Sequence, residues 1–182
     1  MLHLCLPRSR LEVGEAFDPH ALRAWLTDPW SGAPAGAGPH TVLLYPPSPP
    51  DPALPLLAPP PLPPEWLAGD AAALRLVVLD GTWRKSRKML YANPLLQALP
   101  RLPLAPGLPA SGYGGLRRAH APHQLSTLEA TCAALAQLEG GHCDRYAPVR
   151  AAFAAFMARQ VAQREAGRQQ GPVPPAASPA DC

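Results

Sequence analysis

The chain has 182 residues, 47% of them hydrophobic, which is enough for one domain with a core of its own. Its 16 lysines and arginines and 13 acids leave a net charge of +3, so any attraction for nucleic acid must come from local clusters of charge. The four cysteines form no Cys-x-x-Cys pair and no apolar run is long enough to span a bilayer, which excludes common zinc sites, disulfide scaffolds and membrane proteins.

The first elements are a helix and a buried strand. Asp18-Pro19 is typical of a helix start, with Asp18 as the N-cap and Pro19 in the first turn. Leu22, Trp25 and Leu26 then fall on one helical face, and Pro29 ends the segment. After a loop rich in glycine, alanine and proline, residues 41–45 are predicted to form a buried strand.

Residues 46–64 contain eleven prolines in nineteen positions. Proline lacks the backbone N–H and fixes φ, so this stretch is neither helix nor inner strand. We expect a stiff, polyproline-like surface connection, in preference to a ligand for an aromatic-lined partner groove.

The most informative segment follows. Leu76 to Leu79 is predicted to be a buried strand, and it runs directly into Asp80-Gly81-Thr82-Trp83. In open α/β sheets ligands collect where strands end and helices begin. A carboxylate, a hydroxyl and an indole at such an edge, beside a cluster of cations in residues 84–88, indicate a small-molecule site that faces a polyanion.

A break and a long loop come next. Asn93-Pro94 interrupts the basic helix, residues 95–99 allow one further turn, and residues 101–104 allow at best an edge strand. Residues 106–123 are irregular and glycine-rich, and loops of this length are usually functional or disordered.

Ser126 and Glu129 form a Ser-x-x-Glu capping box ahead of a helix that is expected to end near Leu138, before Gly140-Gly141. The start of this helix is either an anion site or only a cap. His142-Cys143 allows half of a metal site, but a loop is favoured, and we expect no metal.

A final packing helix is expected from Pro148, and residues 167–182 are expected to be a disordered tail after a single domain over 1–166. The cysteines, without a disulfide or zinc pattern, favour reduced thiols in the cytoplasm. The fold class expected from these elements is α/β with a mostly parallel sheet.

Three segments resemble, in order, the signature blocks of DTW-domain proteins. They are Asp80-Gly81-Thr82-Trp83 with the basic segment as far as Asn93-Pro94, then Ser111-x-Tyr113 with Leu116-Arg117-Arg118-Ala119, and finally Leu125-Ser126-Thr127-x-Glu129-Ala130. The resemblance covers residues 2–164. The chain starts after the cysteine cluster and the further strand with which many relatives begin, so the domain is expected to be N-terminally short.

The resemblance implies a tRNA-uridine aminocarboxypropyltransferase. Such an enzyme transfers the 3-amino-3-carboxypropyl group of S-adenosylmethionine to N3 of a tRNA uridine and releases methylthioadenosine. It also implies a SPOUT-like fold, which is knotted in a ribosomal-RNA enzyme of the same chemistry. The implied partner is tRNA, with no membrane, and the sequence does not indicate an oligomeric state.

The residues expected to carry this reaction fall into three groups. Those expected to act in catalysis are Asp80, Thr82 and Trp83, with Asp80 as the general base or orienting carboxylate. Those expected at the co-substrate are Tyr45, Trp83, Tyr113, Arg117, Leu125, Ser126, Thr127 and Glu129. Those expected to bind RNA phosphates are Arg84, Lys85, Arg87, Lys88 and Arg118.

Each assignment has a structural alternative. Asp80 is otherwise a cap for the following turn, Trp83 a core residue, and the cations a solvated helix face. The alternative functions are a SPOUT-like RNA methyltransferase and a non-catalytic RNA-binding remnant of the family. The remnant is considered because the N-terminal portion of the family pattern is absent and because Gly114-Gly115 alters the second block.

Overall fold

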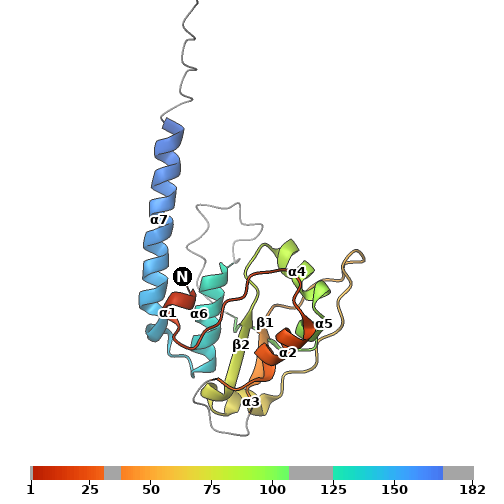
Figure 1. The fold of residues 1–182 in the computed structure, drawn as a ribbon. Coiled ribbons are helices and arrows are strands. Elements are labelled where there is room, and N and C mark those ends of the chain that lie inside the picture. The colour runs from red at the N-terminus through yellow and green to blue at the C-terminus, as the bar shows by residue number, and fades with distance from the viewer. Residues whose placement is uncertain (1, 31–37, 107–124, 170–182) are drawn as a thin grey trace, which may run out of the picture.

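A computed structural model of the protein describes residues 2–30, 38–106 and 125–169. Their centre is a parallel sheet of three strands, β1 (His40–Leu44), β2 (Leu74–Val78) and β3 (Arg101–Leu102), in the order β2-β1-β3 (Figure 1). Leu44 lies opposite Val78 on one side and opposite Leu102 on the other. This confirms the expected α/β class with a parallel sheet. The SPOUT-like topology stays a prediction, because residues 107–124 lie outside the described part of the chain.

The central strand β1 separates two layers of core. Successive side chains of a strand point to opposite faces, so Val42 and Leu43, both fully buried, belong to different clusters. Leu43 packs with α2 (Pro19–Thr27), α4 (Trp83–Ala92) and α5 (Pro94–Gln97). Val42 packs with Ala134 of α6 (Thr127–Leu138) on the opposite face.

The N-terminal helix α2 begins as its sequence indicates. Asp18 accepts a hydrogen bond from the Ala21 backbone N–H at 2.8 Å, and Leu22 and Leu26 are buried. The Thr41 hydroxyl donates to the Leu26 carbonyl at 2.6 Å, which fastens the end of α2 to β1. The helix therefore covers the face of the sheet that carries Leu43.

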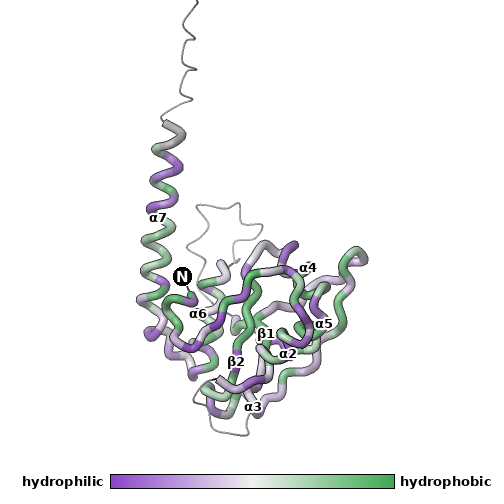
Figure 2. The backbone as a smooth tube through the Cα atoms, in the orientation of Figure 1, coloured by the Kyte–Doolittle hydropathy of each residue, from purple (hydrophilic) through white to green (hydrophobic). Residues whose placement is uncertain are grey.

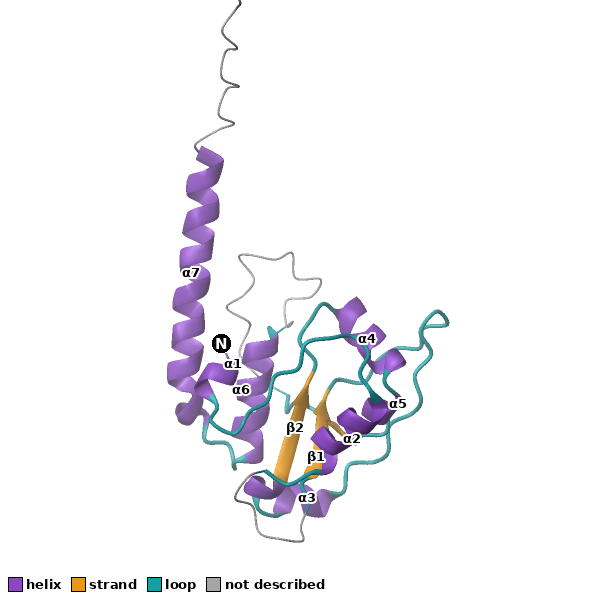
Figure 3. Cartoon of the chain, in the orientation of Figure 1, coloured by secondary structure: helices purple, strands orange, loops and turns teal. Residues whose placement is uncertain are grey.

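The connection from β1 to β2 has no regular structure as far as residue 63, as the prolines predict, and is drawn as a loop in Figure 3. It continues into α3 (Pro64–Ala68) and the 3-10 turn η1 (Ala71–Ala73). The ring of Trp66 in α3 stacks on His40, with 4.5 Å between centroids. This contact places α3 at the amino end of β1.

The strand β2 is less buried than we expected. It begins at Leu74, and most of its residues are only half-buried, because β2 has a single neighbour within the described sheet. Its buried residue is Arg75, which donates to the Trp25 carbonyl at 2.6 Å and lies over the Trp30 ring. Burial lowers the pKa of this guanidinium.

A third layer covers α6. It consists of α1 (Leu2–Cys5), the 3-10 turn η2 (Cys143–Tyr146) and α7 (Ala147–Gln169), which meet α6 around Leu128, Cys132 and Tyr146. Figure 2 shows hydrophobic residues along the strands and mixed hydropathy along α7, whose distal part projects from the rest of the molecule. The helix α7 continues through Gln169, three residues beyond the domain boundary expected at residue 166, since no proline follows its first turn until residue 172. No helix in the described ranges is long and apolar enough to cross a membrane.

Candidate functional site

The carboxyl ends of β1 and β2 lie side by side because the strands are parallel and in register. Leu44 pairs with Val78, so Tyr45 follows one strand at the same edge where Leu79 and Asp80 follow the other. In an open α/β sheet this edge is where ligands bind. The candidate site is therefore built from the segments that leave β1 and β2.

The segment after β2 turns directly into α4. Thr82 is the N-cap of this helix, and its hydroxyl accepts from the Lys85 N–H at 3.3 Å. Asp80 is exposed and its carboxylate accepts no hydrogen bond from another described residue, so the turn before α4 is capped by Thr82 and not, as in the alternative interpretation, by Asp80. Thr82 therefore starts the helix, while the Asp80 carboxylate stays available to a ligand.

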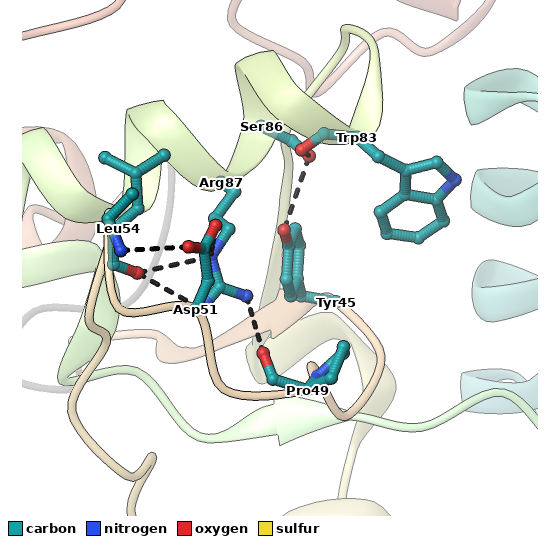
Figure 4. A network of polar contacts seen from close by, with 8 residues as sticks. Tyr45, Pro49, Asp51, Leu54, Trp83, Ser86 and Arg87 are labelled. Atoms are coloured by element: carbon teal, nitrogen blue, oxygen red, sulfur yellow. Dashed lines mark hydrogen bonds and ion pairs between the residues drawn. The ribbon is translucent and has the colours of Figure 1, made fainter.

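Trp83 and Tyr45 form the aromatic part of the site. The two rings meet edge-on, with 5.9 Å between centroids and 73° between planes. Tyr45 is buried and its hydroxyl lies 3.4 Å from the Ser86 hydroxyl of α4, whereas Trp83 is 51% exposed (Figure 4). Trp83 is therefore not a core residue, and much of its indole remains available for stacking.

A hollow of about 620 Å³ opens beside this aromatic pair. It lies between the start of α4 and the first residues of the proline-rich connection, and its lining includes Tyr45, Trp83, Arg84, Arg87 and residues 46–51. A volume of this size falls within the range of roughly 300–1,000 Å³ that is usual for small-molecule sites. Aromatic and proline rings with the exposed Arg84 suit a flat ligand that carries negative charge nearby.

Two arginines fasten the proline-rich connection to the sheet and to α4. Arg87 donates to the carbonyls of Pro49 and Leu54 and forms an ion pair with Asp51. Arg101 of β3 donates to the Pro46 carbonyl at 3.3 Å and lies over the Tyr45 ring. Burial lowers the pKa of Arg101, although an arginine stays charged at neutral pH.

The four cations of α4 have different environments. Arg87 is occupied by the proline-rich connection, and Lys88 donates to Glu15 at 2.6 Å. The hydrogen bond and charge of Lys88 lower the pKa of the Glu15 carboxyl. Arg84 and Lys85 are exposed and form no ion pair with another residue of the described ranges. These two are the cations of α4 best placed to meet a polyanion.

The capping box expected at the start of α6 is confirmed. The Ser126 hydroxyl accepts from the Glu129 N–H at 3.2 Å, and the Glu129 carboxylate accepts from the Ser126 N–H at 2.8 Å. Leu125, Ser126 and Thr127 are half-buried. In Figure 1 the start of α6 lies at the same end of the molecule as the carboxyl ends of β1 and β2. The expected co-substrate residues of this segment therefore border the end of the molecule that holds the hollow.

The structure thus gathers part of the expected site. Around the hollow it brings together Tyr45, Trp83, Arg84 and Arg87, with Asp80 and Thr82 in the turn before α4. It pairs Lys88 with Glu15, and the RNA-binding role expected for Lys88 stays a prediction. Tyr113, Arg117 and Arg118 lie outside the described residues.

Sequence reasoning missed three contributors to the site. The proline-rich connection was expected to be only a surface link, yet residues 46–51 form one wall of the hollow. Arg101 and Ser86 support Tyr45 from β3 and α4. No periodic signal exists in a polyproline-like segment, so its contacts with α4 were not predictable from spacing. The alternation of β1, in contrast, does place Tyr45 on the face that Leu43 shares.

A second hollow of about 640 Å³ lies at the other end of the sheet, between η1 and the end of α6. Its lining includes Asp70, Glu139, His142 and Arg145. Burial and a hydrogen bond to Glu139 raise the pKa of nearby Tyr146 to about 12. No group of three or more metal-ligating side chains occurs within the residues that the structure describes. Because this hollow is at the amino end of β2, it is the less favoured site for a ligand.

Comparison with known proteins identifies one family. The family model described as DTW domain matches residues 1–161 of the chain. No match was found among curated proteins or among solved structures.

Proposed function

Because the chain belongs to the DTW-domain family, known as tRNA-uridine aminocarboxypropyltransferases, we propose that it transfers the 3-amino-3-carboxypropyl group of S-adenosylmethionine to N3 of a tRNA uridine. The co-product is then methylthioadenosine. The observation that supports this proposal is the exposed carboxylate of Asp80 beside a half-exposed Trp83, at the strand edge where a hollow opens.

The residues around the hollow fit an adenosine-containing co-substrate. Its volume suffices for a small molecule, and its aromatic and proline rings suit a nucleoside. S-adenosylmethionine supplies, when bound, an electrophilic carbon next to a positively charged sulfur. We propose that Tyr45 and Trp83 hold it, together with the start of α6 around Ser126 and Thr127. That helix start would favour a carboxylate group through its N–H groups and dipole.

The protein's own groups then act on the uridine. Uridine N3 is a weak acid that must lose its proton as it attacks, and Asp80 is the proposed acceptor of that proton. Trp83 offers a ring on which a base taken out of its stack can lie. Thr82, as the N-cap of α4, sets where the helix begins, so that Trp83 is its first residue and Asp80 stands in the turn before it. Positioning of this kind decides which carbon beside the sulfur reacts.

Cations next to the hollow are proposed to hold the RNA backbone. Arg84 and Lys85 stand at the start of α4, exposed and close to Trp83 in sequence. Phosphate contacts by such residues make affinity fall with salt. Arg118 belongs to the same proposal by its family block.

The test is incubation of the purified protein with S-adenosylmethionine and unmodified tRNA, followed by mass spectrometry of the nucleosides. A uridine that carries the aminocarboxypropyl group, with methylthioadenosine as co-product, is the expected result. Methylated nucleosides with S-adenosylhomocysteine would instead identify a methyltransferase. A protein that binds tRNA but not S-adenosylmethionine would be a non-catalytic RNA-binding protein. The Asp80→Asn variant is the matched control for activity from a contaminant.

A further inference from the structure

Arg87 lies between α4 and the proline-rich connection, and its side chain is only 12% exposed. Its guanidinium donates three hydrogen bonds to this connection: Nη1 to the Pro49 carbonyl at 2.9 Å, and Nε and Nη2 to the Leu54 carbonyl at 3.2 and 3.1 Å. Nε also lies 3.4 Å from the Asp51 carboxylate. Figure 4 shows these contacts converging on one side chain.

The start of the proline-rich connection cannot form a backbone hydrogen-bond network of its own. Four of the five residues from 46 to 50 are prolines, which have no N–H to donate, so their backbone cannot join a ladder of hydrogen bonds. Their carbonyls need donors from elsewhere, and a planar guanidinium supplies several in a fixed geometry. A short turn, in which Leu54 N–H donates to the Asp51 carbonyl at 3.1 Å, presents the acceptors to Arg87.

These same residues form one wall of the hollow. Residues 46–51 and Leu54 face Tyr45, Trp83 and Arg84 across it. The position of this wall therefore depends on whether the connection stays against α4. Arg101 binds the Pro46 carbonyl at the start of the wall, whereas the hydrogen bonds from α4 to Pro49 and Leu54 come from Arg87, so the position of the wall from residue 49 onward depends on Arg87.

We propose that Arg87 is a positioning residue that holds the proline-rich wall at the distance a nucleoside needs. The inference rests on the proposed function, because it takes the hollow to be a nucleoside site. The nucleoside is either the adenosine part of S-adenosylmethionine or the target uridine. In this role the N–H groups of Arg87 donate to the carbonyls of the connection, and Arg87 does not neutralise an RNA phosphate.

The first test follows the wall itself and needs no activity. Hydrogen exchange of the Ala53 and Leu54 amides is measured by mass spectrometry in the wild type, Arg87→Lys and Arg87→Gln. The Ala53 and Leu54 amides are expected to exchange faster in both variants. Lysine keeps the charge, but neither lysine nor glutamine has the planar set of N–H groups with which arginine binds two carbonyls at once. Arg84→Gln, on the same helix but without contact to these carbonyls, is the control and is expected to leave exchange unchanged. Unchanged exchange in both Arg87 variants would overturn the proposal.

The second test measures binding and turnover. Both variants are expected to raise the KM of the substrate whose nucleoside occupies the hollow by about tenfold, with kcat within a factor of about two. The salt dependence of tRNA binding is expected to stay the same. A higher KM for S-adenosylmethionine identifies the adenosine as the occupant, and a higher KM for tRNA identifies the uridine. Wild-type binding by Arg87→Lys with weaker tRNA binding by Arg87→Gln would show a phosphate contact and overturn the proposal.

A variant in the proline-rich connection keeps the proposal testable if the Arg87 variants misfold. If the Arg87 variants fail to fold, Asp51→Asn removes the ion pair from the loop side, keeps the Oδ1 acceptor of the Ala53 N–H and leaves α4 intact. It is expected to give faster exchange at Leu54 and the same selective rise in KM, and normal values for both would contradict the proposal. A protein without transferase activity, but with faster exchange in Arg87→Lys, would overturn the proposed function while leaving this role of Arg87 in place.

Discussion

The ring of Trp83 rests edge-on against the ring of Tyr45, with 5.9 Å between their centroids. A buried residue that directly follows the central strand thus supports a half-exposed residue that begins α4. Tyr45 is in turn held by Ser86 and by the guanidinium of Arg101. The exposed indole therefore packs against a buried ring that is itself held from two sides, which gives the indole a defined orientation before any ligand arrives.

Replacement of Trp83 by alanine is expected to weaken the binding of S-adenosylmethionine or of tRNA by roughly ten- to a hundredfold, because stacking on an aromatic ring contributes about 1–3 kcal/mol per base. The effect on folding should be small, since 51% of Trp83 is exposed. Calorimetric titration and thermal unfolding measure the two effects. Tyr91→Ala, another exposed aromatic residue of α4, is the matched control. An equal loss of binding affinity in both variants would show that the change in α4, and not the loss of the indole, weakens binding.

Asp80→Asn is expected to lower kcat by about 10²–10⁴-fold, the usual contribution of a general base. Binding of S-adenosylmethionine and the free energy of unfolding should stay close to wild type, because Asp80 is exposed and Thr82 caps α4. Single-turnover transfer to tRNA provides the measurement. Asp70→Asn removes a carboxylate that caps η1 at the amino end of β2, the opposite end of the strand from Asp80, and should leave the rate unchanged. Full activity of Asp80→Asn would remove this residue from the mechanism.

The double change of Arg84 and Lys85 to glutamine is expected to reduce the slope of log affinity against log salt for tRNA by about 1 to 2. Each lost phosphate contact no longer releases its counterion. Lys88→Gln is expected to change the slope less, because Lys88 is paired with Glu15. Filter binding over a range of salt concentrations tests both variants. A larger change for Lys88→Gln would mean that the Glu15 pair opens on the RNA.

Asn93 joins the N-terminal segment to the end of α4. Its side chain accepts from the Phe17 N–H at 2.9 Å and donates to the Glu15 and Met89 carbonyls at 2.8 and 2.7 Å. Asn93→Ala is therefore expected to lower the free energy of unfolding by about 2–4 kcal/mol, since it leaves buried backbone groups without partners. Urea unfolding measures the loss. Asn93→Asp keeps the acceptor for Phe17 but sets a buried carboxylate oxygen against two carbonyls, so it should lose at least as much stability, and a nearly unchanged Asn93→Asp protein would argue against this account.

Tyr146 is expected to make the protein sensitive to alkali. Burial and its hydrogen bond to Glu139 raise its pKa to about 12 in the folded state, from 10.0. A raised pKa favours the protonated form, so the stabilisation is fully present below pH 10 and is lost as the pH rises toward 12. Urea unfolding at pH 8 and at pH 11 should show a larger decline for the wild type than for Tyr146→Phe. Parallel declines would assign the alkaline loss to other groups.

Local patterns predicted the elements well, because each depends on neighbouring residues. Asp18 caps α2, Ser126 and Glu129 form their capping box, and residues 41–45 place the central strand within one residue. A helix cap, a turn and the alternation of side chains along a strand depend on contacts among a few neighbouring residues, so they can be predicted from the local sequence. The motif from Asp80 to Trp83 was likewise placed correctly at the end of a strand.

Contacts between distant segments were decided only by the tertiary structure. The sequence by itself determined the parallel α/β class, the capped helices and the strand edge that carries Asp80 and Trp83. It did not determine that Arg87 holds a connection more than thirty residues earlier in the chain, or that Lys88 pairs with Glu15. The physical reason is that a cation on a helix is equally compatible with solvent, phosphate or a carbonyl. Packing of the proline-rich connection against α4 selects among these partners, and that packing has no periodic signal in the sequence.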